Sequence, residues 1–374
     1  MPTPVIVLLA IVVVVGALKL FTWAVNRLTA RRLAKVEALH AWVATEFDLL
    51  PQDRQNTRRA APAPELDAAR AAADRDDWQA CAAMLADADG DWDGRYRLVT
   101  ELADAAAESD DWLRAWRAER PQDADAAVVH ADALVKLAWN VRGAATADRT
   151  SQEQFNTFHR LLGEAREAAA EAQRLAPQDP TPWITELWIA LGLGYSAADF
   201  ERVWAGVTAR DPHSHPGHYA ALQYWCAKWH GSEEEAREFA DRAAGRAPAG
   251  SLLAVLRLVA LHEHEPDGGK DAYYGTPYAA AALETARSAA DAAPAGDPHA
   301  AEIRHLLAWC YTATGRAVEA LDQFKLVDGY VDALPWRYVE DPAAYYCRIR
   351  ALVVRSVVRS LEQKGARVPE EQSA

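Results

Sequence analysis

Histidine is concentrated in one short segment, which is the first place to look for chemistry in this chain. His213, His215 and His218 follow Asp211 and Pro212. Imidazole nitrogens are common ligands of zinc and other transition metals, so one interpretation of this spacing is a metal-dependent enzyme. We favour the other interpretation, in which these residues are loop histidines between two helical units. The metal-dependent enzyme stays as an alternative.

An acidic segment resembles the start of a calcium-binding EF-hand loop. Asp89, Asp91 and Asp93 lie at alternate positions, and Gly94 follows them. Carboxylates at positions one, three and five with glycine at position six suit the oxygen shell of Ca²⁺. The twelfth position, which should hold a bidentate glutamate, is Thr100. We therefore expect a polar turn here and no calcium site.

Other patterns that carry catalysis are missing from the sequence. His262 and His264 lie two residues apart, whereas the zinc-protease pattern needs histidines four apart on one helix face. The chain has no glycine-rich phosphate loop and no Gly-x-Ser-x-Gly nucleophile elbow. The sequence thus predicts a protein that is not an enzyme and that needs no cofactor and no metal.

The composition narrows the kinds of partner. Lys and Arg number 40 against 54 Asp and Glu, and the resulting net charge of −14 argues against nucleic acid, which requires a basic surface. Alanine-rich hydrophobic content of 51% favours close-packed helices. Four widely spaced cysteines fit neither a metal motif nor a disulfide framework, so we expect free thiols in a reducing compartment (Cys81, Cys226, Cys310 and Cys347).

The helices that would position any site follow a repeated pattern, Ala-x3-Ala-x2-Ala-x4-Pro. Spacings of four and three place the side chains on one helix face, and the proline cannot continue the helix. Successive terminal prolines lie 35, 36 and 46 residues apart, a period typical of stacked two-helix repeats. The pattern occurs three times with alanine and once with bulkier residues: Ala165, Ala169, Ala172, Pro177; Phe200, Trp204, Val207, Pro212; Ala236, Ala240, Ala243, Pro248; Ala282, Ala286, Ala289, Pro294.

These units resemble tetratricopeptide repeats. That family expects small residues along the second helix, glycine at the turn between the helices and a terminal proline. Gly231 to Ala236 and Gly315 to Ala320 fit the turn and the start of the second helix. The resemblance covers roughly residues 62 to 340. It implies an all-α fold, a right-handed α-solenoid of helix-turn-helix repeats, on a scaffold that hosts many kinds of binding partner.

The resemblance also implies a groove, because the first helix of each such repeat lines a concave surface at its positions 2, 5, 9, 12 and 13. Aromatic side chains with a few polar neighbours are typical of peptide-binding hot spots. The alternative is that the tryptophans pack between repeats as core. The basic and asparagine clamp with which some relatives bind C-terminal carboxylates is not matched. Counted on two repeats, the partner-binding residues are His218, Trp225, Lys228, Trp229, Glu302, His305 and Trp309.

An apolar stretch at residues 4–25 precedes the repeats. It reaches the ~20 residues that span a bilayer if Lys19 snorkels towards the headgroups. No charged side chain precedes Lys19 and no Ala-x-Ala site follows, which favours a retained single-pass anchor over a cleaved signal peptide. Basic residues follow the stretch, so the positive-inside rule predicts a cytoplasmic body (Arg27, Arg31, Arg32 and Lys35).

The predicted division of the chain has six parts. They are a transmembrane anchor (4–25), a juxtamembrane helix (26–50), a linker (51–64), the repeat domain (65–340), a capping helix (341–363) and a loose tail (364–374). Two repeats are lengthened by insertions, at 142–153 and 265–278. Three motifs are also similar to a bacterial family with a helical-repeat body, and that similarity implies no activity (residues 137–143, 179–183 and 228–231).

Together these observations predict a membrane-anchored, non-catalytic scaffold that binds a protein or peptide partner through its concave helical surface. Its partners would be that protein or peptide and the membrane, and no nucleic acid. The alternative is an assembly or quality-control factor of the cell envelope with an extracytoplasmic body.

Overall fold

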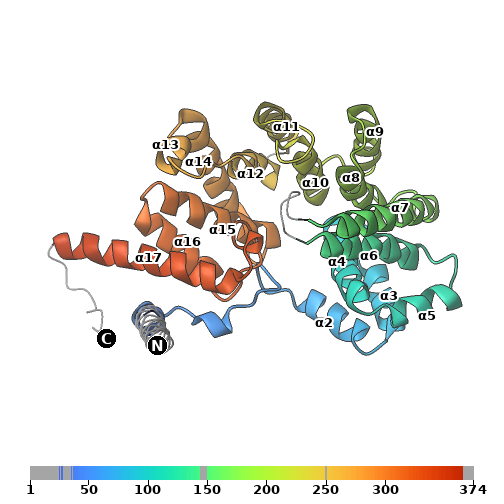
Figure 1. Ribbon diagram of the computed structural model, residues 1–374, viewed down its shortest axis with the longest axis horizontal. Helices are drawn as coiled ribbons and strands as arrows, with labels where there is room; N and C mark the ends of the chain where they lie inside the picture. The colour runs from blue at the N-terminus through green and yellow to red at the C-terminus, as the bar shows by residue number, and fades with distance from the viewer. Residues whose placement is uncertain are drawn as a thin grey trace, which may run out of the picture. The chain divides into compact units, whose positions relative to one another are not determined.

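A computed structural model describes residues 37–143, 150–248 and 251–364, together with Val25, Arg27 and Lys35. Across these residues the chain is helical, with loops and an isolated β-bridge but no strand, so the predicted all-α class is confirmed. The labelled elements (Figure 1) are η1 (Gln52–Arg54), α2 (Pro64–Ala73), α3 (Trp78–Asp87), α4 (Trp92–Glu108), α5 (Asp111–Glu119), α6 (Ala124–Arg142), α7 (Gln152–Leu175), α8 (Thr181–Leu193), α9 (Ala197–Thr208), α10 (His215–Trp225), α11 (Glu233–Arg246), η3 (Leu252–Val255), α12 (Leu256–Glu263), α13 (Lys270–Tyr274), α14 (Pro277–Ala292), α15 (Pro298–Ala313), α16 (Ala317–Val327), η4 (Trp336–Tyr338) and α17 (Pro342–Gln363).

The chain forms two compact units. Unit 1 combines Met1–Ala60 with Gly315–Ala374, and unit 2 is Ala61–Thr314. In unit 2 each even-numbered helix from α2 to α12 packs against the next even-numbered helix, and each odd-numbered helix from α3 to α11 packs against its two neighbours in sequence. The even-numbered row is bent, because α4 also contacts α8 and α10. We call the inner side of this bend the concave face.

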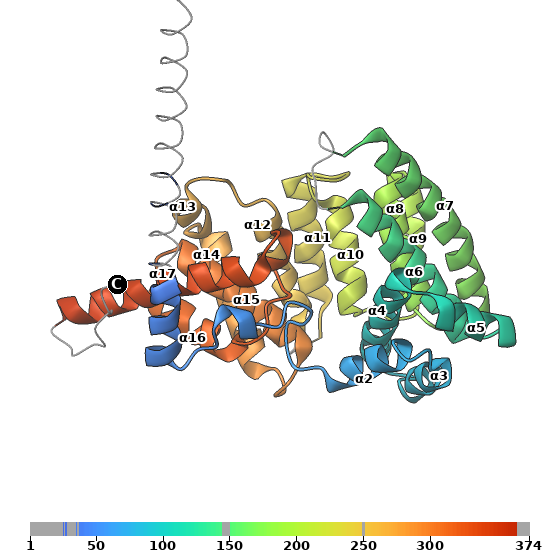
Figure 2. The same cartoon turned by 60° about the horizontal axis from the view of Figure 1, so that its bottom comes forward.

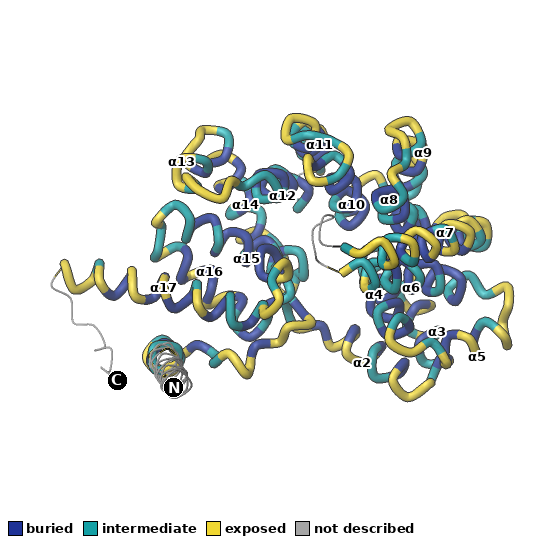
Figure 3. Tube along the Cα trace, viewed as in Figure 1, coloured by how far each residue is buried: buried dark blue, intermediate teal, exposed yellow. Residues whose placement is uncertain are grey.

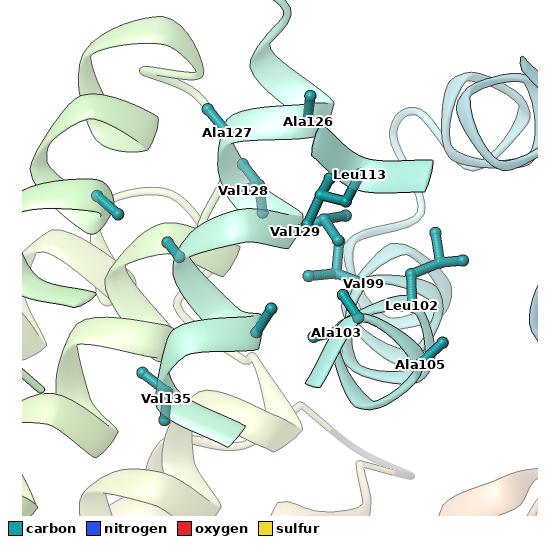
Figure 4. Packing of buried hydrophobic residues seen from close by; sticks show 14 of the residues in the cluster. Val99, Leu102, Ala103, Ala105, Leu113, Ala126, Ala127, Val128, Val129 and Val135 are labelled. Carbon is teal, nitrogen blue, oxygen red and sulfur yellow. The ribbon is translucent and has the colours of Figure 1, made fainter. Parts of the chain in front are cut away.

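Small side chains form the contacts between the helices of unit 2. Ala165, Ala169 and Ala172 on α7 are all fully buried, so the alanine face lets α7 approach its neighbours closely. Figure 3 shows buried and exposed positions alternating along most helices, as expected for amphipathic helices in two layers. One buried cluster joins α2 to α8 and another joins α8 to α12. In Figure 4, Val99 and Leu113 meet Val129 between α4, α5 and α6.

In unit 1, described segments from near the two ends of the chain pack against each other. Asp328, directly after α16, accepts hydrogen bonds from the backbone N–H of Leu50, from the Gln55 amide at 3.1 Å and from the guanidinium of Arg350. Arg350 is 1% exposed and also donates to the Leu50 carbonyl at 2.7 Å. Residues 37–47 are helical and end beside α16 and α17 (Figure 2).

The segment 51–64, for which the sequence predicts a linker, takes part in this packing. It includes η1, which contacts α17. Asn56 forms a parallel β-bridge with Tyr330, through backbone bonds of 2.8 Å to Gly329 and 2.9 Å from Val331. The backbone of Asp332 donates to the carbonyl of Arg59 at 2.9 Å. Residues 55–60 therefore have specific partners inside unit 1.

Several predicted features fall outside the described part of the chain. Of the predicted anchor, 4–25, only Val25 is described, and of the predicted tail, 364–374, only Lys364. No helix among the described residues is both long enough and apolar enough to cross a bilayer. Residues 144–149 of the insertion at 142–153 are also outside the description, whereas the insertion at 265–278 contains α13.

Candidate functional site

All seven residues predicted to line a groove lie in unit 2, but two of them are buried inside it. His218 on α10 is 6% exposed, and its Nδ1 lies 2.7 Å from the carbonyl oxygen of Ser214. Its ring packs edge to face with that of Trp204, with ring centroids 4.7 Å apart. His305 on α15 is fully buried. Because neither imidazole reaches the surface, both residues stabilise the helix packing and are not placed to contact a partner.

The next three predicted residues, Trp225, Lys228 and Trp229, lie at the end of α10 or just after it. Trp225 is the last residue of that helix, and Cys226 turns the chain with extended backbone angles. Lys228 and Trp229 therefore lie in a turn that runs from Cys226 to Gly231 instead of on the helical face that the repeat count assumes. Gly231 permits this turn, because a Cβ there would lie 2.1 Å from the Trp225 carbonyl oxygen.

This turn places Trp229 against the last turn of α6. The indole of Trp229 meets that of Trp139 edge to face, with centroids 5.4 Å apart. The guanidinium carbon of Arg142 lies 5.3 Å from the Trp229 ring and 5.6 Å from the Trp139 ring. We call Trp139, Arg142 and Trp229 the Trp–Arg cluster. Since α8 stands between α6 and α10 in the row, this contact joins two helices that are not adjacent, at the ends where both of them finish.

Among the described residues, no acidic side chain pairs with the guanidinium of Arg142. Its guanidinium donates to the Gly143 carbonyl at 3.1 Å and forms no ion pair within the described part of the chain. Burial lowers the pKa of Arg142. Lys228 differs, because its ammonium lies 2.7 Å from a carboxylate oxygen of the buried Glu263 side chain. Arg142 is thus a partly desolvated cation held by two aromatic rings.

Trp309, another predicted groove residue, is held by the insertion at 265–278. Its indole N–H donates to Glu265 at 2.6 Å, and the ammonium of Lys270 lies 4.8 Å from the ring centroid. Tyr274 donates to the same carboxylate at 2.7 Å. Burial alone would raise the pKa of Glu265, but hydrogen bonds from these groups and His262 lower it to about 2. Trp309 therefore anchors the insertion to α15.

Glu302, the last predicted residue, lies beside a cluster that brings three distant helices together. His299 at the start of α15 bonds Asp93 on α4 at 2.8 Å, and its other ring nitrogen is 4.0 Å from Glu302. The His215 ring at the start of α10 lies tilted against that of His299, with centroids 3.9 Å apart. The bond between His299 and Asp93 joins residues 206 positions apart in sequence, within unit 2.

We expect this histidine cluster to make the stability of unit 2 depend on pH. Burial alone would lower the pKa of His299, but Asp93 and Glu302 raise it to about 10, whereas burial and the neighbouring His299 charge lower that of His215 to about 3. A raised folded-state pKa contributes stability that is fully present below the unfolded pKa of about 6.5 and is lost as the pH rises towards 10.

Replacing His299 by glutamine should therefore destabilise the protein by about 1–3 kcal/mol near pH 6.5, with the difference shrinking towards pH 9.5. Urea unfolding of the full chain at several pH values measures it. His213→Gln is the control, because His213 is exposed and its replacement should change the free energy of unfolding little at any of these pH values. An effect of His299→Gln that is constant across the range would contradict the assignment.

The two metal sites considered from sequence are not formed. Asp91 caps α4 by accepting from the backbone of Gly94 at 3.1 Å, and α4 begins at Trp92, so residues 89–94 do not form a calcium loop. His215 and His218 are engaged as described, and His213 is exposed. Throughout the described ranges, no group of three or more His, Cys, Asp or Glu side chains could hold a metal ion.

Comparison with known proteins adds no identification. No protein-family model matches the sequence, and a search of curated proteins gives no match.

The repeat count did not select Trp139 and Arg142 as candidate site residues, because it considers one helix at a time. A signal was nevertheless present, because the motifs at 137–143 and 228–231, noted separately in the sequence, are the two segments that meet in the Trp–Arg cluster.

Proposed function

We propose that the protein is a non-catalytic scaffold that binds a protein or peptide partner on the concave face of unit 2, as a right-handed solenoid of tetratricopeptide-like repeats. The observation that carries the proposal is the Trp–Arg cluster, in which two partly exposed indoles lie against a guanidinium that has no ion pair within the described ranges. Tryptophan and arginine are the residue types that dominate binding hot spots. Stacked repeats present such a surface ready formed, so little entropy is lost by the scaffold on binding.

Other polar groups of the concave face support the same proposal. Tyr96 of α4 forms a hydrogen bond with Trp188 of α8 across the bend. The Trp188 ring in turn lies beside the Tyr219 ring, with ring centroids 6.3 Å apart. Lys136 on α6 pairs with Asp104 on α4 at 3.2 Å. A face with partly exposed aromatic and paired polar groups suits a peptide with both apolar and polar contacts.

We further propose that residues 4–25 anchor this scaffold in a membrane as a single pass with the body in the cytoplasm. The support is the apolar stretch and the basic residues after it. In that arrangement the anchor restricts the partner to the membrane surface, and the concave face supplies the binding area. A protease-accessibility assay on intact cells tests the orientation, since a cytoplasmic body is protected and an extracytoplasmic body is cleaved.

Site-specific photo-crosslinking of the full-length protein in cells tests the binding surface. Ala227 is exposed in the turn beside Trp229, and Arg202 on α9 is an exposed control position. We expect a defined partner to crosslink from position 227 and not from position 202. Trp229→Ala should weaken binding about 30-fold, as for a hot-spot residue, and remove the adduct while the protein stays folded. Equal adducts from both positions, or an adduct unchanged by Trp229→Ala, would refute the proposal.

A further inference from the structure

The guanidinium of Arg142 is the feature of the Trp–Arg cluster whose chemistry is most specific. A guanidinium carries five N–H donors in a planar fork that matches a carboxylate. The described contacts of Arg142 occupy one of its terminal nitrogens, through the Gly143 carbonyl. Apart from the two indole rings, the rest of the fork has no hydrogen-bond or ion-pair partner among the described residues, although the protein carries 54 acidic side chains. Arg142 thus has N–H donors available for a carboxylate that the described residues do not supply.

Comparison with other arginines of unit 2 that stack on tryptophan supports this interpretation. Arg120 lies 4.9 Å from the Trp78 ring and also faces the carboxylate of Asp123 at 3.8 Å. Arg210 lies 4.5 Å from the Trp183 ring, and two of its nitrogens donate to the carbonyls of Pro177 at 2.8 Å and Gly206 at 2.7 Å. Arg120 thus faces a carboxylate and Arg210 donates through two nitrogens, whereas Arg142 has no such carboxylate within the described ranges and donates through one nitrogen.

The surroundings of Arg142 favour a side-chain carboxylate over a chain terminus. To fix a terminal carboxylate and its backbone, a site needs further polar donors around it. The indole N–H groups of Trp139 and Trp225 are buried without a hydrogen-bond partner in the described structure, so they do not reach a surface ligand. Lys228, the nearest cation in sequence to Trp229, faces Glu263. The cluster therefore presents one guanidinium, that of Arg142, with the indole rings of Trp139 and Trp229 beside it.

We propose that Arg142 binds an aspartate or glutamate side chain of the partner, and that Trp139 and Trp229 hold the guanidinium in place and cover the apolar residues that flank that acid. This inference rests on the proposed function and specifies the chemistry of the partner. The two rings fix the guanidinium in advance, so less side-chain entropy is lost when the carboxylate binds. Because the surroundings are partly desolvated, the ion pair is screened less by salt than one on an open surface.

Two libraries of random peptides, selected on the purified full-length protein, test the proposal. In the first, peptides are fused through their C-termini to a phage coat protein and have no free terminal carboxylate. In the second, they are fused through their N-termini and end in a free carboxylate. We expect binders from the first library that share an acidic residue next to an apolar one. Arg142→Gln should weaken them about 10- to 100-fold, and changing that acid to its amide should weaken them equally.

A double-mutant cycle and a matched control complete the experiment. Once Arg142→Gln is present, replacing the peptide acid should cost little more, since the two groups act as a pair. Arg120→Gln removes a similar Trp-stacked arginine elsewhere in unit 2 and should leave binding unchanged. Acidic binders found only with a free C-terminus, or binding that Arg142→Gln does not change, would overturn the inference. Binders lost on Trp229→Ala but kept on Arg142→Gln would leave the proposed function standing, whereas no selected binder at all would count against both.

Discussion

Replacement of Arg95 by methionine is expected to lower the free energy of unfolding of unit 2 by about 3–5 kcal/mol. Arg95 is 5% exposed, and its Nε donates to Asp179 at 2.7 Å while a terminal nitrogen donates to Asp125 at 2.5 Å. Its other terminal nitrogen donates to the Leu85 carbonyl at 3.2 Å. Methionine fills much of the same space but leaves Asp179, itself 4% exposed, as a buried carboxylate that has lost its ion pair and keeps the bond from the Thr181 N–H at 2.7 Å.

The control for this variant is Arg114→Met. Arg114 on α5 also bridges two aspartates, Asp110 at 2.6 Å and Asp111, but its side chain is 63% exposed. Water and salt screen such pairs, so the expected loss is about 0–1 kcal/mol. Urea unfolding followed by tryptophan fluorescence compares the two variants. If Arg95→Met proved no more harmful than Arg114→Met, the buried network would contribute no net stability.

Replacement of Asp328 by asparagine is expected to destabilise unit 1 by a similar amount, about 3–5 kcal/mol. Asp328 is the carboxylate that neutralises Arg350, and Arg350 is 1% exposed. An amide keeps the shape of the side chain but removes its charge, so a buried guanidinium remains uncompensated. The bonds from Leu50 and Gln55 to the same carboxylate are weakened as well.

Hydrogen exchange resolves this effect by segment. In Asp328→Asn we expect amides in α17 and in residues 49–60 to exchange about 100- to 1000-fold faster, while those of α6 and α7 stay protected. Asp332→Asn is the control, since its side chain is 42% exposed and lies 3.6 Å from Arg337. Unchanged protection of residues 49–60 in Asp328→Asn would show that this segment does not depend on the buried ion pair.

The helices of this fold could be predicted from sequence because their signals are local. In α11 the predicted face Ala236, Ala240 and Ala243 is buried, as the four-and-three spacing requires. In α14, Ala282 and Ala286 are buried as well. A pattern of small residues followed by proline can be recognised within one helix. The absence of strands from the described part of the chain agrees with the same local evidence.

The candidate site could be predicted only in part, because its geometry depends on contacts between distant segments. The count that selected Lys228 and Trp229 assumes a helix that continues to residue 229, but α10 ends at Trp225. That ending is fixed by a turn whose glycine packs on the Trp225 carbonyl. The binding role of the predicted residues stays a prediction, with His218 and His305 now placed in the core.

The contact between Trp229 and Arg142 is even harder to predict from the sequence than the end of α10. The two residues are separated by α7, α8, α9 and α10, and their contact exists because the even-numbered row bends. The same holds for Asp93 and His299, whose ion pair joins α4 to α15. Periodicity states which face of a helix is buried, but the curvature that brings two faces together comes from the summed packing of every helix between them.

The composition of unit 1 has a consequence for biosynthesis. The hydrogen bond between Leu50 and Arg350 spans 300 residues. At about 5–20 residues per second, roughly 15–60 s of translation separate the appearance of these two residues. The helices of unit 2 can dock on one another as they leave the ribosome, since each contacts near neighbours in sequence. Residues 49–60, in contrast, wait without partners until α17 is made. A stalled ribosome or a premature stop codon would therefore yield a chain whose first segment stays open to proteases and chaperones.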